Sequence, residues 1–314
     1  MANEIEKYNL LALSDIEKIN GFADSDIEKL NGFEFSALPD KGIFGYGGTY
    51  SDMSMTNLVS NSGVVATDVT GVGTARQLLA ACEYGTGNAI FGYGGTYPST
   101  VSMTNLVNTS GVVATDTTGV GTARNGLAAC AYGTDKGIFG YGTSNPTNLV
   151  SNTGVVASDV TGVGTGRQVL AACEYGTDKG IFGYGYESGA QSMTNKVSNS
   201  GVVATDTTGV GTDRHYLAAC SYGTDKGVFG YGTGPQSMTN LVSNTGVVAT
   251  DTTGVGTARG SLAACEYGVD KGIFGYGVAG AYVSMTNLVS NSGVVATDTT
   301  GVGTARNRLA AAGY

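Results

Sequence analysis

One tetrapeptide, Phe-Gly-Tyr-Gly, recurs six times along this chain of 314 residues. The copies begin at Phe44, Phe91, Phe139, Phe182, Phe229 and Phe274, so neighbouring copies lie 43 to 48 residues apart. The flanking residues repeat as well, from residue 41 to the last residue. A period of this length is typical of propellers and solenoids, in which each repeat is one supersecondary unit.

Each repeat divides into four apolar segments separated by turn residues. In the unit that spans residues 170–214, the segments are 170–175, 179–185, 194–199 and 202–206. The chain has 52 glycines, no tryptophan and 13% charged residues, a composition that favours strands and tight turns over solvated helices. We therefore predict an all-β fold, a six-bladed β-propeller of four-stranded blades over residues 34–314.

The two ends of the repeat array are complementary. The array begins with a second-strand segment and ends, at residues 309–314, with a first-strand segment. Pairing of these segments would remove two unpaired sheet edges. We therefore predict that the C-terminal strand overlaps the first repeat and closes the propeller. Residues 33–36 are a rival first strand, but the C-terminal segment is favoured because its sequence matches the other copies.

Residues 1–33 form a separate module with an eleven-residue repeat of Ile-Glu-Lys, at Ile5, Ile16 and Ile27. Asn-Gly follows two of these units and resembles a helix stop, which predicts short helical turns. The segment is interpreted either as a frayed tail or as a tether that docks on a larger assembly. We expect no secretory signal and no membrane span, because no apolar run is long enough.

The cysteines occupy one position of the repeat. They are Cys82, Cys130, Cys173, Cys220 and Cys265, and Ala312 is the sixth equivalent. Equivalent positions in successive repeats are usually too far apart to bridge, so we expect reduced, buried thiols. The sequence has no Cys-x-x-Cys spacing, so the cysteines do not indicate a metal site.

The sequence contains no pattern typical of an active site. The single histidine, His215, has no second histidine or cysteine partner with which to form a nucleophile–base pair or metal cluster. The carboxylates are interpreted as lying either in every repeat or in the N-terminal segment. We expect a protein without enzymatic activity, cofactor or metal.

Each repeat carries an aspartate and an arginine eight residues apart. We expect these charges to tie neighbouring repeats together as a structural ring rather than to bind a ligand. The pairs are Asp68 and Arg76, Asp116 and Arg124, Asp159 and Arg167, Asp206 and Arg214, Asp251 and Arg259, and Asp298 and Arg306.

Near-identical repeats differ at two places, the loop between strands two and three and the two residues after the arginine. In an up-and-down blade both emerge on one face, while the nearly invariant turns emerge on the other. Tyr, Ser, Gly, Asn and Gln dominate these positions, as in adaptable recognition loops, although surface loops also drift without selection. The candidate binding residues are Tyr50, Asp52, Tyr97, Asn145, Tyr186, Glu187, His215, Tyr216, Gln236, Tyr282 and Arg308.

The repeat resembles the Kelch motif. Ala-Arg, two free residues and Leu-Ala-Ala are followed by Lys-Gly-Ile-Phe-Gly-Tyr-Gly-Gly, seen at residues 41–48. The resemblance covers all six repeats and implies a propeller. The chain departs from that pattern because the second glycine is kept only at Gly48 and Gly95 and the tryptophan near strand four is missing.

The repeat sequence also resembles structural proteins of tailed bacteriophages. The resemblance rests on Thr-Asn-Leu-Val-Ser-Asn-Thr-Gly-Val-Val-Ala-Thr-Asp in the repeats and on Asp-Ile-Glu-Lys-Ile-Asn-Gly near the N-terminus. This resemblance implies a protein of the virion surface, on a tail, fibre or capsid. We expect residues 1–33 to bind virion proteins and the variable face to bind a host surface glycan or receptor, or a partner virion protein. The alternatives are a decoration or spacer protein and a multivalent sugar-binding lectin.

The net charge of −9 has no compensating basic cluster. Nucleic-acid binding requires a surface that neutralises phosphates, so neither nucleic acid nor an anionic membrane is an expected partner.

Overall fold

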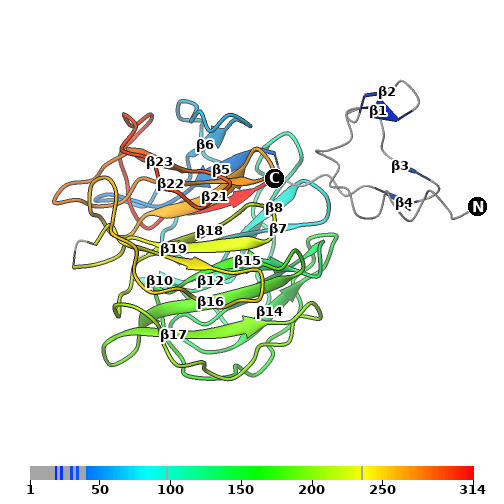
Figure 1. The fold of residues 1–314 in the computed structure, drawn as a ribbon. Coiled ribbons are helices and arrows are strands. Elements are labelled where there is room, and N and C mark those ends of the chain that lie inside the picture. The colour runs from blue at the N-terminus through cyan, green and yellow to red at the C-terminus, as the bar shows by residue number, and fades with distance from the viewer. Residues whose placement is uncertain are drawn as a thin grey trace, which may run out of the picture. The chain divides into compact units, whose positions relative to one another are not determined.

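A computed structural model describes residues 40–96, 98–234 and 236–314, together with four two-residue strands between residues 18 and 34. The chain divides into two compact units, Met1–Ala37 and Leu38–Tyr314. The regular structure of the described residues is entirely β (Figure 1). These residues include no helix that is long and apolar enough to cross a membrane.

The described part of the second unit is built from six three-stranded antiparallel sheets, numbered here in chain order of their middle strands. In each, a Leu-Ala-Ala segment supplies the inner strand, the middle strand contains Phe-Gly, and Thr-Asn-Leu-Val or its variant Thr-Asn-Lys-Val contributes the third. Sheet 1 is β24 (Ala310–Gly313), β5 (Gly42–Gly45) and β6 (Thr56–Val59); sheet 2 is β7 (Ala80–Tyr84), β8 (Asn88–Gly92) and β11 (Thr104–Val107); sheet 3 is β12 (Ala128–Tyr132), β13 (Lys136–Gly140) and β14 (Thr147–Val150). Sheet 4 is β15 (Ala171–Tyr175), β16 (Lys179–Tyr186) and β17 (Ala190–Val197); sheet 5 is β18 (Ala218–Tyr222), β19 (Lys226–Gly230) and β20 (Thr239–Val242); sheet 6 is β21 (Ala263–Tyr267), β22 (Lys271–Gly275) and β23 (Thr286–Val289).

Three further pairings complete the description of the strands and correct one prediction. β9 (Gly95–Thr96) pairs with β10 (Ser99–Thr100). In the N-terminal unit, β1 (Lys18–Ile19) pairs with β2 (Phe22–Ala23), and β3 (Lys29–Leu30) pairs with β4 (Phe33–Glu34). The helical turns predicted there are wrong at these residues. The two strands of each N-terminal pair are separated in sequence by Asn-Gly, which is the strongest short signal for a two-residue hairpin and was misread as a helix stop.

The predicted fourth strand of each repeat is also wrong, because the segment forms only isolated bridges. In sheet 1 these bridges join Val59 to Val65 and Thr56 to Val69. Between the two bridges, the predicted fourth strand is therefore one residue longer than the third strand that it faces. Such an extra residue interrupts a ladder. The Asn57 side chain occupies the interruption, since its Nδ2 donates to the carbonyl of Ala66 at 3.0 Å.

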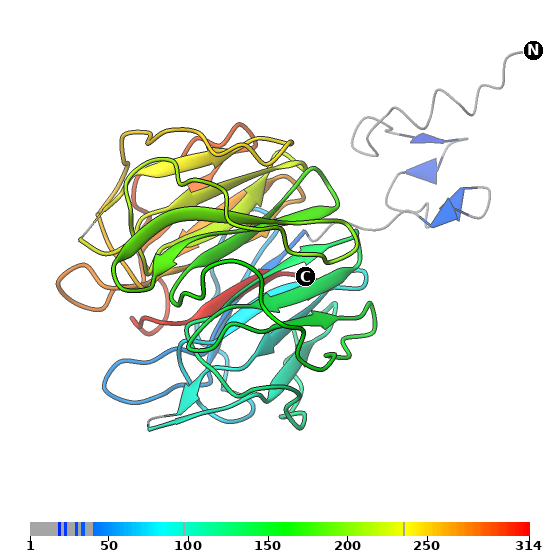
Figure 2. The same ribbon diagram turned by 90° about the horizontal axis from the view of Figure 1, so that it is seen from below.

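The C-terminal strand pairs with the first strand of the array. Ala310 to Gly313 in β24 pair antiparallel with Gly45 to Gly42 in β5, and the Tyr314 N–H donates to the Lys41 carbonyl. β24 also contacts β21 and β7, the inner strands of sheets 6 and 2. Figure 2 shows this red C-terminal strand lying among the blue and cyan strands of sheets 1 and 2. The rival segment is not used at its described residues, since Phe33–Glu34 pairs with β3 instead.

The hydrophobic core lies between neighbouring sheets in six clusters of similar composition. The repeated tetrapeptide explains the packing. The Phe91 ring of sheet 2 fills the space beside Gly45 of sheet 1, where an added Cβ would lie 2.6 Å from it. The same ring meets Tyr46 edge-on, with centroids 5.1 Å apart. The aromatic rings and the glycines of the tetrapeptide therefore alternate, and the ring of one sheet packs against the glycine of its neighbour.

The five cysteines are free and buried, and each fits against a glycine of another sheet. A Cβ at Gly42 would lie 2.6 Å from Cys265 Sγ, so the thiol occupies the volume of the missing side chain. Among the six repeats, the cysteine of this contact is replaced once and the glycine is replaced once. Ala312 replaces the cysteine of sheet 1, Ala89 replaces the glycine of sheet 2, and both belong to one core cluster. Two residues far apart in sequence thus lie in one core cluster at this contact.

Ala312→Cys should destabilise the protein, and Ala89→Gly in the same chain should relieve the effect. The new thiol would overpack against Ala89, which typically costs about 1–3 kcal/mol. Denaturant unfolding of both single variants and the double variant, analysed as a cycle, measures the coupling. Additive effects would contradict the assignment of these residues as a compensating pair.

Candidate functional site

Six residues that follow the repeated arginines form a closed ring of main-chain hydrogen bonds. We call them the central mouth: Leu78, Gly126, Val169, Tyr216, Ser261 and Arg308. Each N–H donates to the carbonyl of the preceding member at 2.6 to 2.9 Å, and the Leu78 N–H donates to the Arg308 carbonyl. With six buried leucines beneath them, these residues line a cavity of about 70 Å³, and the leucines are Leu79, Leu127, Leu170, Leu217, Leu262 and Leu309.

Every member of the central mouth has a left-handed backbone. The φ angles run from 51° at Val169 to 65° at Gly126, and five of the six residues are not glycine. A β-branched residue in this conformation is an outlier, and such a conformation persists only where the surroundings determine it. The closed ring supplies that constraint through main-chain atoms, so the side chain at each position is free to differ.

The two variable regions lie together. In four of the six repeats, the residue after the arginine bridges to the start of the loop between strands two and three of the following sheet, as Gln168 does with Tyr186 and Asn307 does with Gly48. In the other two repeats, the carbonyl of this residue accepts a main-chain hydrogen bond from the same loop. The nearly invariant turns also meet one another, since Asn152 Nδ2 donates to Asp135 Oδ2 at 3.0 Å.

Four of the predicted binding residues make a continuous row. The His215 ring lies between Tyr186 and Tyr216, with centroid distances of 5.1 and 5.3 Å. The Arg308 guanidinium carbon lies 5.9 Å from the centroid of the Tyr216 ring, and its Nη1 donates to Gln77 Oε1 at 3.3 Å. Burial lowers the pKa of His215, so this ring is neutral near pH 7.

Two further tyrosines form a second, smaller cluster. Tyr50 and Tyr282, from the loops of sheets 1 and 6, meet edge-on with centroids 5.9 Å apart. The Tyr282 hydroxyl donates to the Thr49 carbonyl at 3.2 Å, whereas the Tyr50 side chain is 98% exposed.

The remaining candidates join neither cluster through a hydrogen bond or ring contact in the described part of the chain. Asn145 Nδ2 donates to the Gly164 carbonyl, Glu187 accepts from Ser188, and Asp52 bridges Gly48 through the backbone. Gln236 makes main-chain hydrogen bonds. Tyr97 lies outside the described residues.

The repeated arginines and aspartates lie between neighbouring sheets. Arg76 is fully buried over the Tyr46 ring of sheet 1, and it donates to the Tyr93 carbonyl and to Asn105 Oδ1 of sheet 2 at 2.8 and 2.7 Å. Asp116, also from the second repeat, accepts from the Thr74 N–H and hydroxyl beside that arginine. The pairs that are eight residues apart in sequence therefore contact the adjoining repeats rather than each other.

Hydrogen bonding holds these aspartates in the charged form. Partial burial alone would raise the pKa of Asp116, but hydrogen bonds from Thr74 and Asn105 outweigh it and lower the pKa. Equivalent bonds from Thr304 and Asn57 outweigh burial in the same way and lower the pKa of Asp68.

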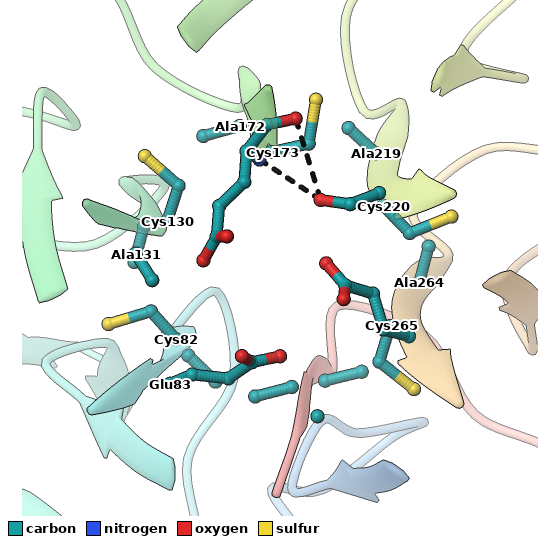
Figure 3. Close-up of a pocket in the computed structure, with 18 residues that line it drawn as sticks. Cys82, Glu83, Cys130, Ala131, Ala172, Cys173, Ala219, Cys220, Ala264 and Cys265 are labelled. Carbon is teal, nitrogen blue, oxygen red and sulfur yellow. Dashed lines mark hydrogen bonds between the residues drawn. The ribbon is translucent and has the colours of Figure 1, made fainter. Parts of the chain in front are cut away.

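The distribution of carboxylates differs from the prediction. Glu83, Glu174 and Glu266 lie on the inner strands of alternate sheets, whereas the equivalent residues in the other three are Ala131, Ser221 and Gly313. The three glutamates line a second cavity, of about 50 Å³, with the cysteines and small residues of all six inner strands. Figure 3 shows the Glu83 side chain pointing into it. We call it the glutamate cavity, and the alternation after the cysteine position was the overlooked signal.

The glutamates are difficult to ionise together. Burial and repulsion from Glu266 raise the pKa of Glu174 to about 8. Burial, with repulsion from the other two glutamates, raises the pKa of Glu83 as well. Burial also raises the pKa of Glu266, although hydrogen bonds from Ser221 oppose it. No arginine or lysine lines this cavity, and within the described residues no group of carboxylates, thiols or imidazoles is arranged to hold a metal ion.

We expect the protein to lose stability as the pH rises from 5 to 8. The folded state holds protons on the glutamates more tightly than the unfolded chain, so their contribution is complete below the usual pKa of 4.5 and is lost through the folded value, about 8 for Glu174. The aspartates with lowered pKa stay charged throughout this window. Melting temperatures at several pH values measure the slope.

The triple variant Glu83→Gln, Glu174→Gln, Glu266→Gln should have a flatter pH profile and a higher melting temperature at pH 8 than the parent. Glu187→Gln, which removes an exposed glutamate, is the matched control and should leave the profile unchanged. A parent protein whose stability rises between pH 5 and 8 would contradict the assignment.

Comparison with known proteins adds no family to this description. The chain matches no protein-family model, and the search of curated proteins gives no match.

Proposed function

We propose that residues 38–314 form a closed six-bladed β-propeller in which the six sheets are the blades. Pairing of β24 with β5 supports the overlap of the two ends. Contacts between successive inner strands, including β24 with β7, support the ring order. The cyclic hydrogen bonds of the central mouth support closure independently, since each of the six repeats contributes one member.

We further propose that this propeller is a non-enzymatic recognition module. The observation that carries the proposal is the contact row of Tyr186, His215, Tyr216 and Arg308, because all four occupy positions that differ between otherwise near-identical repeats. Tyrosine and arginine are among the residues that most often anchor binding, and tyrosine buries a large area at small entropic cost. Neutral drift of loops does not by itself bring such side chains into contact.

In this proposal the protein belongs to the surface of a tailed-phage virion. The N-terminal segment, residues 1–33, binds other virion proteins, and the variable face binds a host surface glycan or a partner virion protein. Two observations support this proposal: the repeat sequence resembles those of phage structural proteins, and the N-terminal residues form a separate unit. A chain that starts at residue 38 should fold and melt as the parent does, yet fail to join particles.

The recognition face is tested by paired substitutions. Tyr186→Ala with Tyr216→Ser should abolish binding to host cells or to glycans on an array, whereas Thr177→Ala with Ser198→Ala on the invariant turns should not. Losing one true anchor typically costs about 2 kcal/mol of binding energy. Serine is chosen at position 216 because Ser261 holds the same backbone conformation. Equal effects from the two pairs, with both variants folded, would refute a role for this face.

A second candidate, a decoration or spacer protein, is favoured by one different observation. The first valine after the turn between segments three and four is 60 to 65% exposed in every repeat: Val64, Val112, Val155, Val202, Val247 and Val294. Six equivalent apolar side chains are suited to contact with an assembly that needs no variable loop. Valine-to-threonine changes at all six would then prevent incorporation into particles while the tyrosine substitutions would not.

A further inference from the structure

The central mouth is chemically two-sided. In ring order, three adjacent members carry no polar side-chain group (Leu78, Gly126 and Val169), and the other three carry hydroxyl or guanidinium groups (Tyr216, Ser261 and Arg308). The leucines below make the floor apolar. A ligand group that enters the mouth would therefore meet side-chain hydrogen-bond donors along one half only.

Arg308 is the cation at this mouth, and no other residue of the described chain neutralises it. The six repeated arginines are buried between sheets. Lys136, Lys179, Lys226 and Lys271 each form an ion pair with the preceding aspartate, and Lys41 lies 3.5 Å from Asp40. No carboxylate of the described residues lies within ion-pair distance of the Arg308 guanidinium.

Two buried nitrogen atoms of the contact row lack a partner in the described part of the chain. They are Arg308 Nε and His215 Nδ1. Buried polar atoms in folded proteins are nearly always hydrogen-bonded, to protein, water or ligand. Both atoms belong to the row that ends at the mouth, where a polar group from outside the chain would complete their hydrogen bonding.

We propose that the central mouth binds the carboxylate of an acidic saccharide, with Arg308 as the charge partner and the Tyr216 and Tyr186 rings as the surface for the sugar. This inference rests on the proposed recognition function. A guanidinium fork matches a planar carboxylate, and a charge-assisted pair of this kind is stronger than a neutral one. A cavity of about 70 Å³ admits a carboxylate but not a pyranose ring, so the ring of the sugar lies outside, against the tyrosines.

The experiment compares three probes on the full chain by calorimetry: oligosaccharides that end in glucuronate, in glucose and in glucose 6-phosphate. We expect the glucuronate probe to bind best. Arg308→Ser should weaken that probe about tenfold or more, the factor expected for loss of a charge-assisted hydrogen bond, and leave the glucose probe unchanged. Arg308→Lys keeps the charge without the fork, so its affinity for the glucuronate probe should lie between those of the parent and Arg308→Ser.

Lys196→Gln is the matched control. It removes another cation of the second unit for which the described residues provide no ion pair, and Lys196 Nζ donates to the Thr245 carbonyl at the invariant turns. This control should bind all three probes as the parent does, and every variant should keep the parent melting temperature.

The outcomes separate this inference from the function on which it rests. Equal binding of glucuronate and glucose probes, sensitive to Tyr216→Ser but not to Arg308→Ser, would overturn the acidic ligand and keep the recognition face. Tightest binding of the phosphate probe would overturn the carboxylate. Binding that is insensitive to both variants, or no binding of any probe together with cell binding that survives both variants, would overturn the inference and the recognition face together.

Discussion

Deleting residues 309–314 is expected to unfold or aggregate the protein at temperatures where the full chain is folded. The deletion removes β24, leaves β5 with an unpaired edge and exposes the inner strands of sheets 2 and 6. Burial of Leu309 alone is worth about 1.5–3 kcal/mol, and the lost strand pairing adds to this. Exposed strand edges pair with other chains, so aggregation should accompany the loss. Thermal melts with light scattering measure both.

A circular permutant provides the matched control. Three other repeats read Tyr-Gly-Thr-Asp-Lys-Gly where this chain has its C-terminal Tyr314 beside Asp40-Lys41-Gly42. Joining Tyr314 to Asp40 through Gly-Thr, with new ends opened at an exposed loop of another sheet, keeps every strand of the six sheets. The permutant should retain the parent melting temperature. A deletion variant as stable as the parent would mean that pairing of β24 with β5 does not hold the two ends of the array together.

Arg259→Ala is expected to be the most damaging single substitution among the charged residues. The fully buried guanidinium lies 4.4 Å from the Tyr231 ring centroid and donates to the Tyr276 carbonyl at 2.9 Å and Asn287 Oδ1 at 2.7 Å. Removing it leaves those oxygens buried without a donor, and each buried acceptor left unsatisfied typically costs about 1–3 kcal/mol. Denaturant unfolding measures the loss.

Two variants test whether geometry or charge is responsible. Arg259 Nη1 also donates to the Thr257 carbonyl at 3.1 Å. Arg259→Lys keeps the charge but cannot donate to these three acceptors from one plane, so it should recover only part of the stability. Arg308→Ala removes an arginine from a partly exposed position and should change the free energy of unfolding by about 0.5 kcal/mol or less. Similar losses from Arg259→Ala and Arg308→Ala would contradict the importance assigned to the buried fork.

The sequence predicts the main elements because the repeat presents them six times. Inner and middle strands begin within one residue of their predicted positions in the unit 170–214, and the C-terminal segment pairs where its likeness to other copies places it. The fourth strand was not predictable from apolar alternation. Whether Asn57 stays at the surface or replaces a ladder bond depends on a bulge that only the folded backbone defines.

The candidate site was predictable in its location but not in its connections. Comparison of repeats identified the variable positions, yet nothing in the sequence says that His215 lies between Tyr186 and Tyr216, or that Arg308 reaches Tyr216 from two repeats away. The glutamate cavity was missed for another reason. A search for charges shared by all repeats overlooks Glu83, Glu174 and Glu266, which become neighbours only when alternate strands surround one centre.

The ring of main-chain hydrogen bonds has a consequence for how such a chain can change over generations. Near-identical repeats recombine readily, and an exchange between two of them swaps the residue at the mouth without touching the bonds that hold it, since these involve only N–H and carbonyl groups. A crossover that adds or removes a whole repeat, by contrast, leaves the ring with seven or five members, so that every hydrogen bond in it must take a new geometry. Selection on such genes should therefore preserve the number of repeats while it reshuffles the side chains at their centre.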